Sequence, residues 1–371
     1  MKNMEKRSTW MNEQEKMLIK KIFSAYYRNF KFNVPEIEKR EFGVGFEKKI
    51  DARHLSFENE SQLRNYLIEN TPFFISYSAA HYEKPSITPI EKKGWLGADL
   101  VFDLDYHHQG KYEIYKFLGK VKEDLIRLSE DFLQNDFGID KNEIVYVFSG
   151  NRGYHIHVRS KDTFLLGSNE RREIVDYIRG VGLNTNEFFS KDDRGKIIGP
   201  KINDSGYRGR FVKKFILELE KNPSKFYRGF SNKEKLDNFL KGTEAGNWSR
   251  IPFSIEKLNL KIKPISDSLP LSCVDADAGV TYDIKKLIRM PNSLHGETGF
   301  IAKEIRDIES FEPMTDALIK TTKMMDVEFI EDVSDFEIGG SIYSFKIGDK
   351  KEIPLPIGLF FILKGSAKTK K

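Results

Sequence analysis

Two stretches of the sequence, LVFDLD at Leu100–Asp105 and EIVYVFSGNRGYHIHV at Glu143–Val158, decide how the middle of the chain folds. Both are rich in β-branched and aromatic residues, which favour strands, and the second has a glycine-containing turn between two apolar runs. Between them, Gly119–Phe137 has apolar residues at helical spacing and is followed by Gly138, a residue typical of a helix C-terminus. These patterns predict one strand, an amphipathic helix and a pair of strands.

The first stretch ends in two aspartates, Asp103 and Asp105. Side chains two residues apart on a strand share a face, with α-carbons roughly 6.5 to 7 Å apart. Two carboxylates on one strand end can bridge a pair of divalent cations about 3.5 to 4 Å apart, the arrangement used for in-line attack on phosphorus. The alternative is a solvated strand end at which the two aspartates begin a turn.

The second stretch contains the turn SGNRGY between its two strands. Gly150 and Gly153 would let backbone amides approach an anion closely, as in an anion-binding nest. Ser149 adds a hydroxyl group, Arg152 a positive charge, and His155 a donor for a phosphate oxygen. An ordinary β-hairpin turn is the alternative interpretation.

A third stretch, VDADAGVTYDIKKLIRMPNSLHGETG at 274–299, combines acidic residues with groups suited to phosphate binding. Asp275 and Asp277 have strand spacing, and Asp283 follows them. The cationic and imidazole groups of the stretch are Lys285, Lys286, Arg289 and His295. A loop, a short amphipathic helix and a turn would also account for the pattern.

Outside these stretches, the sequence predicts helices over 12–30 and 61–72, the second capped by Ser61, and an extended hairpin over 40–57. The charged segment from about 161 to 247 is predicted to be helical, with strand-like character resuming near Lys261. The tail from Phe336 to Leu363 is predicted to be β-like.

Composition excludes little. The 371 residues carry a formal net charge of only +5, which is too small to indicate a polyanionic partner. The single cysteine, Cys273, excludes an intramolecular disulfide and a cysteine-rich zinc knuckle.

The N-terminus has no signal-like apolar core, and the longest apolar run, Ile353–Leu363, is far shorter than the roughly 18 to 20 residues that span a bilayer. We therefore expect a cytoplasmic protein without membrane contact.

Taken in order, the three stretches resemble motifs of the catalytic small subunit of archaeal and eukaryotic replicative DNA primases. FDLD resembles the first motif of that family, SGNRGYH its SGxxGxH motif, and RMPNSLHGETG its SLHxxTG-like block. REF at 40–42, followed by Arg53 twelve residues after Glu41, resembles a fourth. The resemblance covers about residues 35 to 300.

The resemblance implies a mixed α/β catalytic core with mixed or antiparallel sheets. Residues 1–160 would form its N-terminal part, 161–250 a helical insertion subdomain, and 251–371 its C-terminal part. It also implies that Asp103, Asp105 and Asp277 are catalytic metal-bridging carboxylates, with Asp275 and then Asp283 as weaker candidates for the third. The residues implied for nucleotide binding are Arg53, Ser149, Gly150, Arg152, Gly153, His155, Arg289 and His295. Glu41 matches an acidic residue of the family, but an edge-strand charge would serve equally well as its explanation.

The function implied is synthesis of short primers de novo on single-stranded DNA during replication, from NTPs or dNTPs, with two Mg²⁺ or Mn²⁺ ions. Template and primer DNA and a large regulatory subunit, forming a heterodimer, are the implied partners. The motifs alone also allow a repair-type primase-polymerase that extends existing ends, a metal-dependent nuclease, or a non-catalytic nucleic-acid-binding module.

Family members commonly carry a Cys/His zinc cluster just beyond the DxD strand, where this chain has only His107 and His108. The HxH pair formed by His155 and His157 has no adjoining carboxylate or third histidine in the sequence. We therefore do not expect a structural zinc site.

Overall fold

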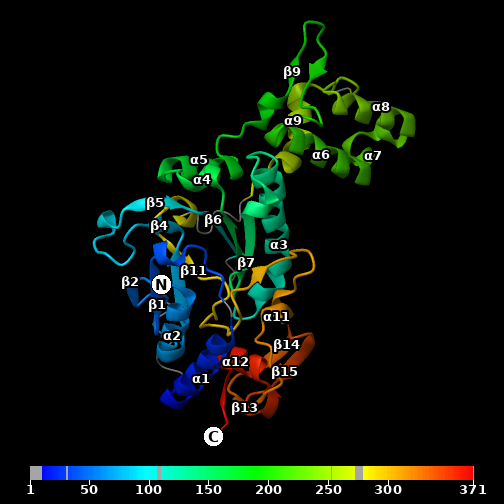
Figure 1. Ribbon diagram of the computed structural model, residues 1–371. Helices are drawn as coiled ribbons and strands as arrows, with labels where there is room; N and C mark the ends of the chain where they lie inside the picture. Colours follow the sequence, from blue (N-terminus) through cyan, green and yellow to red (C-terminus); the bar gives the residue numbers. More distant parts are fainter. Residues whose placement is uncertain (1–10, 31, 107–109, 252, 272–278, 371) are drawn as a thin grey trace. The chain divides into compact units, whose positions relative to one another are not determined.

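The computed structural model describes residues 11–30, 32–106, 110–251, 253–271 and 279–370 (Figure 1). The chain divides into two compact units. Unit 1 comprises 1–125, 142–172 and 276–371, and unit 2 comprises 126–141 and 173–275. None of the helices in the described part of the chain has the length and apolar character needed to cross a membrane. The three predicted segments with boundaries at 160 and 250 stay a prediction.

Unit 1 contains two four-stranded antiparallel sheets. The first sheet has the strand order β11 (Leu287–Arg289), β3 (Phe74–Ser78), β1 (Phe42–Gly45) and β2 (Ala52–Leu55). The second sheet has the order β12 (Glu304–Ile305), β7 (Ile144–Phe148), β8 (Gly153–Val158) and β6 (Leu100–Asp105). In each sheet one edge strand, β11 or β12, comes from the part of the chain that follows unit 2.

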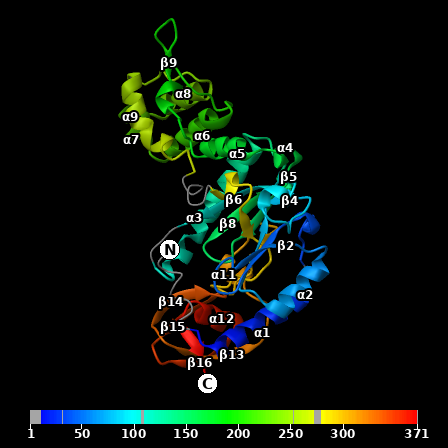
Figure 2. The same cartoon turned by 90° about the vertical axis from the view of Figure 1, so that its left-hand side faces the viewer.

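The second sheet follows the sequence patterns closely. Leu100, Phe102 and Leu104 of β6 are fully buried, whereas Asp103 and Asp105 are only half-buried. The predicted helix over 119–137 is observed as α3 (Leu118–Arg127), which continues as the π-helical segment η5 (Leu128–Gln134). Both views show α3 beside the sheet (Figures 1 and 2). The mixed α/β class predicted for the chain is confirmed.

The helices and smaller sheets around these two sheets complete unit 1. Its helices are α1 (Glu13–Asn29), α2 (Glu60–Asn70), α4 (Lys161–Phe164), α10 (Gly279–Tyr282), α11 (Pro313–Asp316) and α12 (Leu355–Leu363). Its remaining strands are β4 (Ala80–Tyr82), β5 (Trp95–Ala98), β13 (Met324–Phe329), β14 (Val333–Ile338), β15 (Ser341–Phe345), β16 (Lys350–Pro354) and β17 (Ala367–Thr369). Helix α5 (Ser168–Ile178) starts in unit 1 and ends in unit 2.

Unit 2 is built around aromatic side chains. Trp248 is fully buried and contacts the rings of Phe211, Phe215 and Phe239. The helices of the unit are α6 (Gly206–Lys221), α7 (Pro223–Phe226), α8 (Lys233–Glu244) and α9 (Ile255–Ser266), and its short strands are β9 (Ser190–Lys191) and β10 (Ile197–Ile198). The aromatic residues of α6 thus belong to the core of this unit, whereas its basic residues do not.

Three expectations are corrected. The tail is not β-like to its end, because 355–363 forms α12, whose residues from Pro356 to Leu363 are all buried. A helix that is apolar on every side has no polar face, so its periodicity cannot be read from the sequence. Strand-like character does not resume at Lys261, which lies within α9. Asn59, not Ser61, caps α2, its side chain accepting a hydrogen bond from the Gln62 amide.

Candidate active site

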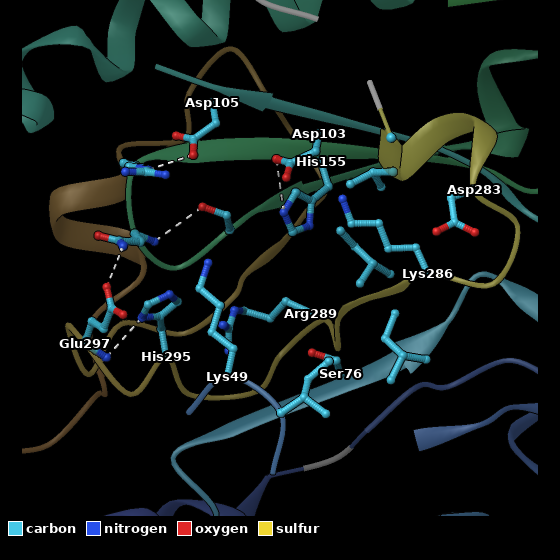
Figure 3. Close-up of a pocket in the computed structure, with 18 of the residues that line it drawn as sticks. Lys49, Ser76, Asp103, Asp105, His155, Asp283, Lys286, Arg289, His295 and Glu297 are labelled. Carbon is cyan, nitrogen blue, oxygen red and sulfur yellow. Dashed lines mark hydrogen bonds and ion pairs between the residues drawn. The ribbon is translucent and has the colours of Figure 1, made fainter. Parts of the chain in front are cut away.

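A cavity of about 1150 Å³ in unit 1 is lined by most of the predicted site residues (Figure 3). It exceeds the usual range of roughly 300 to 1,000 Å³ for small-molecule sites. The predicted residues that line it are Arg53, Asp103, Asp105, Ser149, Arg152, His155, Asp283, Arg289 and His295. Asp275 and Asp277, like His107, His108 and Cys273, lie outside the described residues.

The two carboxylates of β6 project from one strand face toward this cavity (Figure 3). Strand pairing places Asp103 opposite His155 and Asp105 opposite Gly153 of β8. Arg152 donates from Nε to Asp105 Oδ2 at 2.6 Å, and His155 Nε2 lies 3.5 Å from Asp103 Oδ1. The antiparallel register therefore brings the first and second motifs into direct contact.

His155 is a buried imidazole that is neutral at ordinary pH. Burial is the main cause that lowers its pKa to about 3, and the nearby Arg289 charge lowers it further, while Asp105 acts in the opposite direction. His155 therefore acts as a hydrogen-bonding group and not as a cation. His157 is also buried, and its ring stacks on that of Tyr77. Within the described ranges, no group of three or more His, Cys, Asp or Glu side chains could hold a metal.

The turn between β7 and β8 is held by Ser149. Its Oγ accepts hydrogen bonds from the backbone amides of Asn151 and Gly153, at 3.4 and 3.2 Å. Gly150 has a φ of +80°, and a Cβ atom there would lie 2.9 Å from the Cβ of His295. A Cβ atom at Gly153 would lie 2.1 Å from the carbonyl oxygen of Leu104. The two glycines thus permit close contact with other protein segments, and two amides of the expected anion nest already donate to Ser149.

Hydrogen bonds join the third motif, which contains Glu297 and Thr298, to the turn between β7 and β8. Thr298 donates from Oγ1 to the carbonyl oxygen of Gly150 at 2.5 Å, and Asn151 donates from Nδ2 to Glu297 Oε2 at 3.3 Å. Arg289 lies at the end of β11 and pairs with Ser76 of β3. Its guanidinium lies 5.3 Å from the centre of the Phe74 ring. Arg289 and the 149–153 turn therefore border one cavity, although about 140 residues separate them in sequence.

His295 is oriented by its own loop. Its Nδ1 accepts a hydrogen bond from the Glu297 amide at 3.1 Å, so the neutral ring carries its proton on Nε2. The ring packs edge-on against Phe74, with the planes at 83°, and the residue is only 4% exposed. His295 consequently offers a fixed N–H donor on the cavity wall.

Glu41 lies in a buried ionic cluster next to the cavity. Its carboxylate accepts from Arg53 Nε at 2.8 Å and lies 3.2 Å from the ammonium of Lys93, which is itself fully buried. Burial alone would raise the pKa of Glu41, but the hydrogen bonds and charges of Arg53 and Lys93 together lower it below its ordinary value. The interpretation of Glu41 as an edge-strand charge is wrong, because the residue is fully buried and directly precedes β1, which is an inner strand.

Several residues that line the cavity were missed in the sequence. They are Lys49, Ser76, Asn151, Glu297 and Lys364. Asn151 and Glu297 lie inside recognised motifs, so their neighbours could have indicated them. Lys49 lies in a run of charged residues that looks like any solvated turn, and Lys364 directly follows the mispredicted helix α12.

Carboxylates on one strand that face arginine and imidazole side chains across a cavity are an arrangement typical of enzymes that act at phosphorus centres. A family model described as DNA primase small subunit matches residues 102–307, more than half of the chain. The DNA primase small subunit PriS of Archaeoglobus fulgidus is 34% identical over 95% of this chain and 98% of its own length. The PriS proteins of Methanothrix thermoacetophila and Thermoplasma volcanium are 32% and 33% identical over 96% and 94% of this chain and 99% and 96% of their own lengths. The chain belongs to the DNA primase small-subunit family, and its class of activity is DNA-directed nucleotidyl transfer.

Proposed function

We propose that this cavity binds a nucleoside triphosphate beside the 3′-hydroxyl of an initiating nucleotide or primer on single-stranded DNA, and that the chain starts primers de novo. The observation that carries the proposal is the convergence of three separate motifs on one cavity, with Asp103 and Asp105 facing Arg289 and His295. The size of the cavity also suits a nucleotide together with a strand end.

Asp103 and Asp105 fit the role of ligands for two Mg²⁺ or Mn²⁺ ions, with Asp277 as the proposed third carboxylate. Carboxylate oxygens suit both cations, and the two side chains share one strand face that is half-open to the cavity. When bound, such a pair of cations lowers the pKa of the attacking hydroxyl and offsets the charge of the triphosphate and the leaving pyrophosphate.

The protein's own groups would orient the triphosphate and offset its charge. Arg289 supplies a guanidinium on the opposite wall from the carboxylates, and His295 supplies the N–H on Nε2. Arg152, bonded to Asp105, links the carboxylate side to the turn at Ser149. Arg53 is held by Glu41 and by its own bond from Nη2 to the Lys285 carbonyl at 3.2 Å.

We propose a larger primase subunit as the partner in a heterodimer, and template and primer DNA as further partners. The names of the relatives, each of which is called a small subunit, support the larger subunit as a partner. The cytoplasmic location expected from the sequence stays a prediction.

Incubation of the purified chain with unprimed single-stranded DNA, labelled nucleotides and either Mg²⁺ or Mn²⁺ tests the proposal. We expect labelled primers from the wild-type chain and none from Asp103→Ala. Product that forms only on primed templates would favour a repair-type enzyme, and release of mononucleotides from labelled DNA would favour a nuclease. Normal primer yield from Asp103→Ala would contradict the assignment of the carboxylates.

A further inference from the structure

Lys49 lies on the turn between β1 and β2, and hydrogen bonds fix this turn. Asp51 Oδ2 accepts from the backbone amides of Phe46, Glu47 and Lys48, at 2.7, 2.8 and 3.2 Å. The Asp51 amide in turn donates to the carbonyl oxygen of Val44 at 2.8 Å. The Asp51 carboxylate and one backbone hydrogen bond thus hold the turn, which sets the direction in which Lys49 points.

The Lys49 side chain extends into the middle of the cavity. Figure 3 shows it passing beside His295 and Arg289 toward the side on which Asp103 and Asp105 lie. Lys48, the preceding residue of the same turn, is not among the residues that line the cavity. The turn therefore directs one of two adjacent lysines into the site.

The charge of Lys49 has unfavourable surroundings. The residue is exposed to the cavity, yet protein surrounds it closely enough that burial is the main cause lowering its pKa below the ordinary value. The guanidinium groups of Arg289 and Arg152 lower it further, whereas Asp103 and Asp105 act in the opposite direction. An anion that enters the cavity would offset the two like charges and stabilise the Lys49 ammonium.

Two other cations that line the cavity have carboxylate partners. Arg53 bonds to Glu41, and Lys285 bonds to Glu91 at 2.9 Å. Among the described residues, no carboxylate oxygen lies within 4.0 Å of the Lys49 ammonium nitrogen, the distance limit for an ion pair. An ammonium that is directed into a cavity and lacks such a partner is suited to an anion from outside the protein.

We propose that Lys49 is a phosphate-binding residue of this cavity, and that it binds the triphosphate of the nucleotide together with Arg289. The proposal rests on the nucleotide site described under Proposed function and adds a group that belongs to no recognised motif. A lysine ammonium suits this role because it is a compact charge on a flexible stem that can follow a phosphate oxygen. The phosphate could belong to the nucleotide or to the DNA strand, and the two sources are separated by experiment.

Titration of the full chain with inorganic tripolyphosphate, followed by calorimetry at low salt, tests the proposal without requiring synthesis. We expect Lys49→Met to weaken binding about tenfold, the loss that corresponds to one charge-assisted phosphate contact. Lys49→Arg should retain most of the affinity because the positive charge is kept. Lys48→Met is the matched control from the same turn and should bind like the wild type.

A second arm measures binding of a fluorescent single-stranded oligonucleotide to the same variants. If only this binding weakens in Lys49→Met, Lys49 contacts a DNA phosphate and the phosphate-binding role stands. If Lys49→Met matches Lys48→Met in both arms, while thermal unfolding shows that both variants are folded, the proposal is wrong. In primer synthesis, we expect Lys49→Met to raise the KM for nucleotide about tenfold with a smaller change in kcat.

The experiments distinguish a failure of the proposed primer synthesis from a failure of the proposed role of Lys49. If the wild-type chain makes no primer, the proposed function fails, but the tripolyphosphate titration still reports on Lys49. If the wild type makes primers and Lys49→Met has unchanged affinity and KM, only the role of Lys49 is overturned.

Discussion

Asp103 and Asp283 line the same cavity but have different surroundings. Asp103 is half-buried on β6 next to His155, whereas Asp283 is exposed and accepts a hydrogen bond from the Lys285 amide at 3.0 Å. We predict that Asp103→Asn lowers kcat for primer synthesis at least about a thousandfold, or about 4 kcal/mol, because the neutral amide cannot replace a carboxylate in charge stabilisation. Incorporation of labelled nucleotide on unprimed DNA measures this.

Asp283→Asn is the control for this loss. We expect less than about a threefold change in kcat, since its hydrogen bond to the turn survives the substitution. A large loss from Asp283→Asn with normal activity of Asp103→Asn would reverse the assignment of the two carboxylates.

The neutral state of His155 leads to a prediction on pH. Because burial and Arg289 lower its pKa to about 3, the folded protein keeps this imidazole almost entirely uncharged from pH 5 upward. The ring resonances of His155, identified by their loss in His155→Gln, should therefore stay constant between pH 5 and pH 8 in an NMR titration without added metal. A midpoint near the ordinary value of about 6.5 would show that the ring is far more hydrated than the structure has it.

At the scale of elements, the β1–β2 turn depends on Asp51. Asp51→Ala removes the acceptor for three backbone amides, so we predict a loss of about 1 kcal/mol in the free energy of unfolding, because each exposed hydrogen bond contributes little. The KM for nucleotide should rise as well, since Lys49 is no longer held in one direction. Urea unfolding and steady-state kinetics measure the two effects.

Asp51→Asn is the matched variant, because its amide oxygen can still accept from the turn. It should retain more of both properties than Asp51→Ala. If Asp51→Ala destabilises the protein but leaves the KM for nucleotide unchanged, the turn does not position Lys49.

Elements with strong local patterns were predictable from the sequence. The amphipathic face of α3 and the alternation in β6 are set by residues close together in the chain, so periodicity revealed both. Helix α12 could not be found this way, because it is buried on all sides and carries no polar stripe. The choice between Asn59 and Ser61 as the cap of α2 depends on the residue at which the helical backbone conformation begins, which sequence patterns do not fix to within one or two residues.

The site was predictable only in part for a similar reason. Motifs resembling a known family identified Asp103, Arg152 and His295, because each lies in a recognisable string of residues. The register that places Asp103 opposite His155, and the turn that directs Lys49 inward, depend on contacts between distant segments. Such contacts leave no periodic pattern in one sequence.

At the scale of the molecule, a buried ion pair joins several elements of unit 1. Arg40 is 1% exposed and donates from Nη2 to Asp99 Oδ2 at 2.8 Å, and Arg171 donates from Nη1 to the carbonyl oxygen of Asp99 at 2.9 Å. Burial alone would raise the pKa of the Asp99 carboxyl, but His81 and Arg40 together lower it well below its ordinary value. The pair therefore connects the segments before β1 and β6 with the start of α5.

The Arg40–Asp99 ion pair should make the free energy of unfolding depend on pH in the acidic range. A lowered folded-state pKa means that the contribution of Asp99 is complete above its unfolded pKa of about 3.9, and is lost as the pH falls from there toward the folded value. We predict that Asp99→Asn costs about 3 to 5 kcal/mol at pH 7, because Arg40 keeps a buried charge without its partner. Urea unfolding midpoints between pH 7 and pH 2 measure this.

The variant should also depend less on pH than the wild type between about pH 4 and pH 2. Asp332→Asn, which breaks the exposed pair with Lys346, is the control and should shift the midpoint little. Equal effects of the two substitutions would mean that the buried pair contributes no more than a surface contact.

The order of strands has a consequence for how the chain is made. On the ribosome, β3 and β7 emerge long before β11 and β12, because the whole of 173–275 is translated in between. Until then each nascent sheet has an open border of unbonded amides and carbonyls, to which another chain could add. Aggregation of truncated products that stop short of residue 287, relieved when 276–371 is supplied as a separate fragment, would reveal this interval of vulnerability.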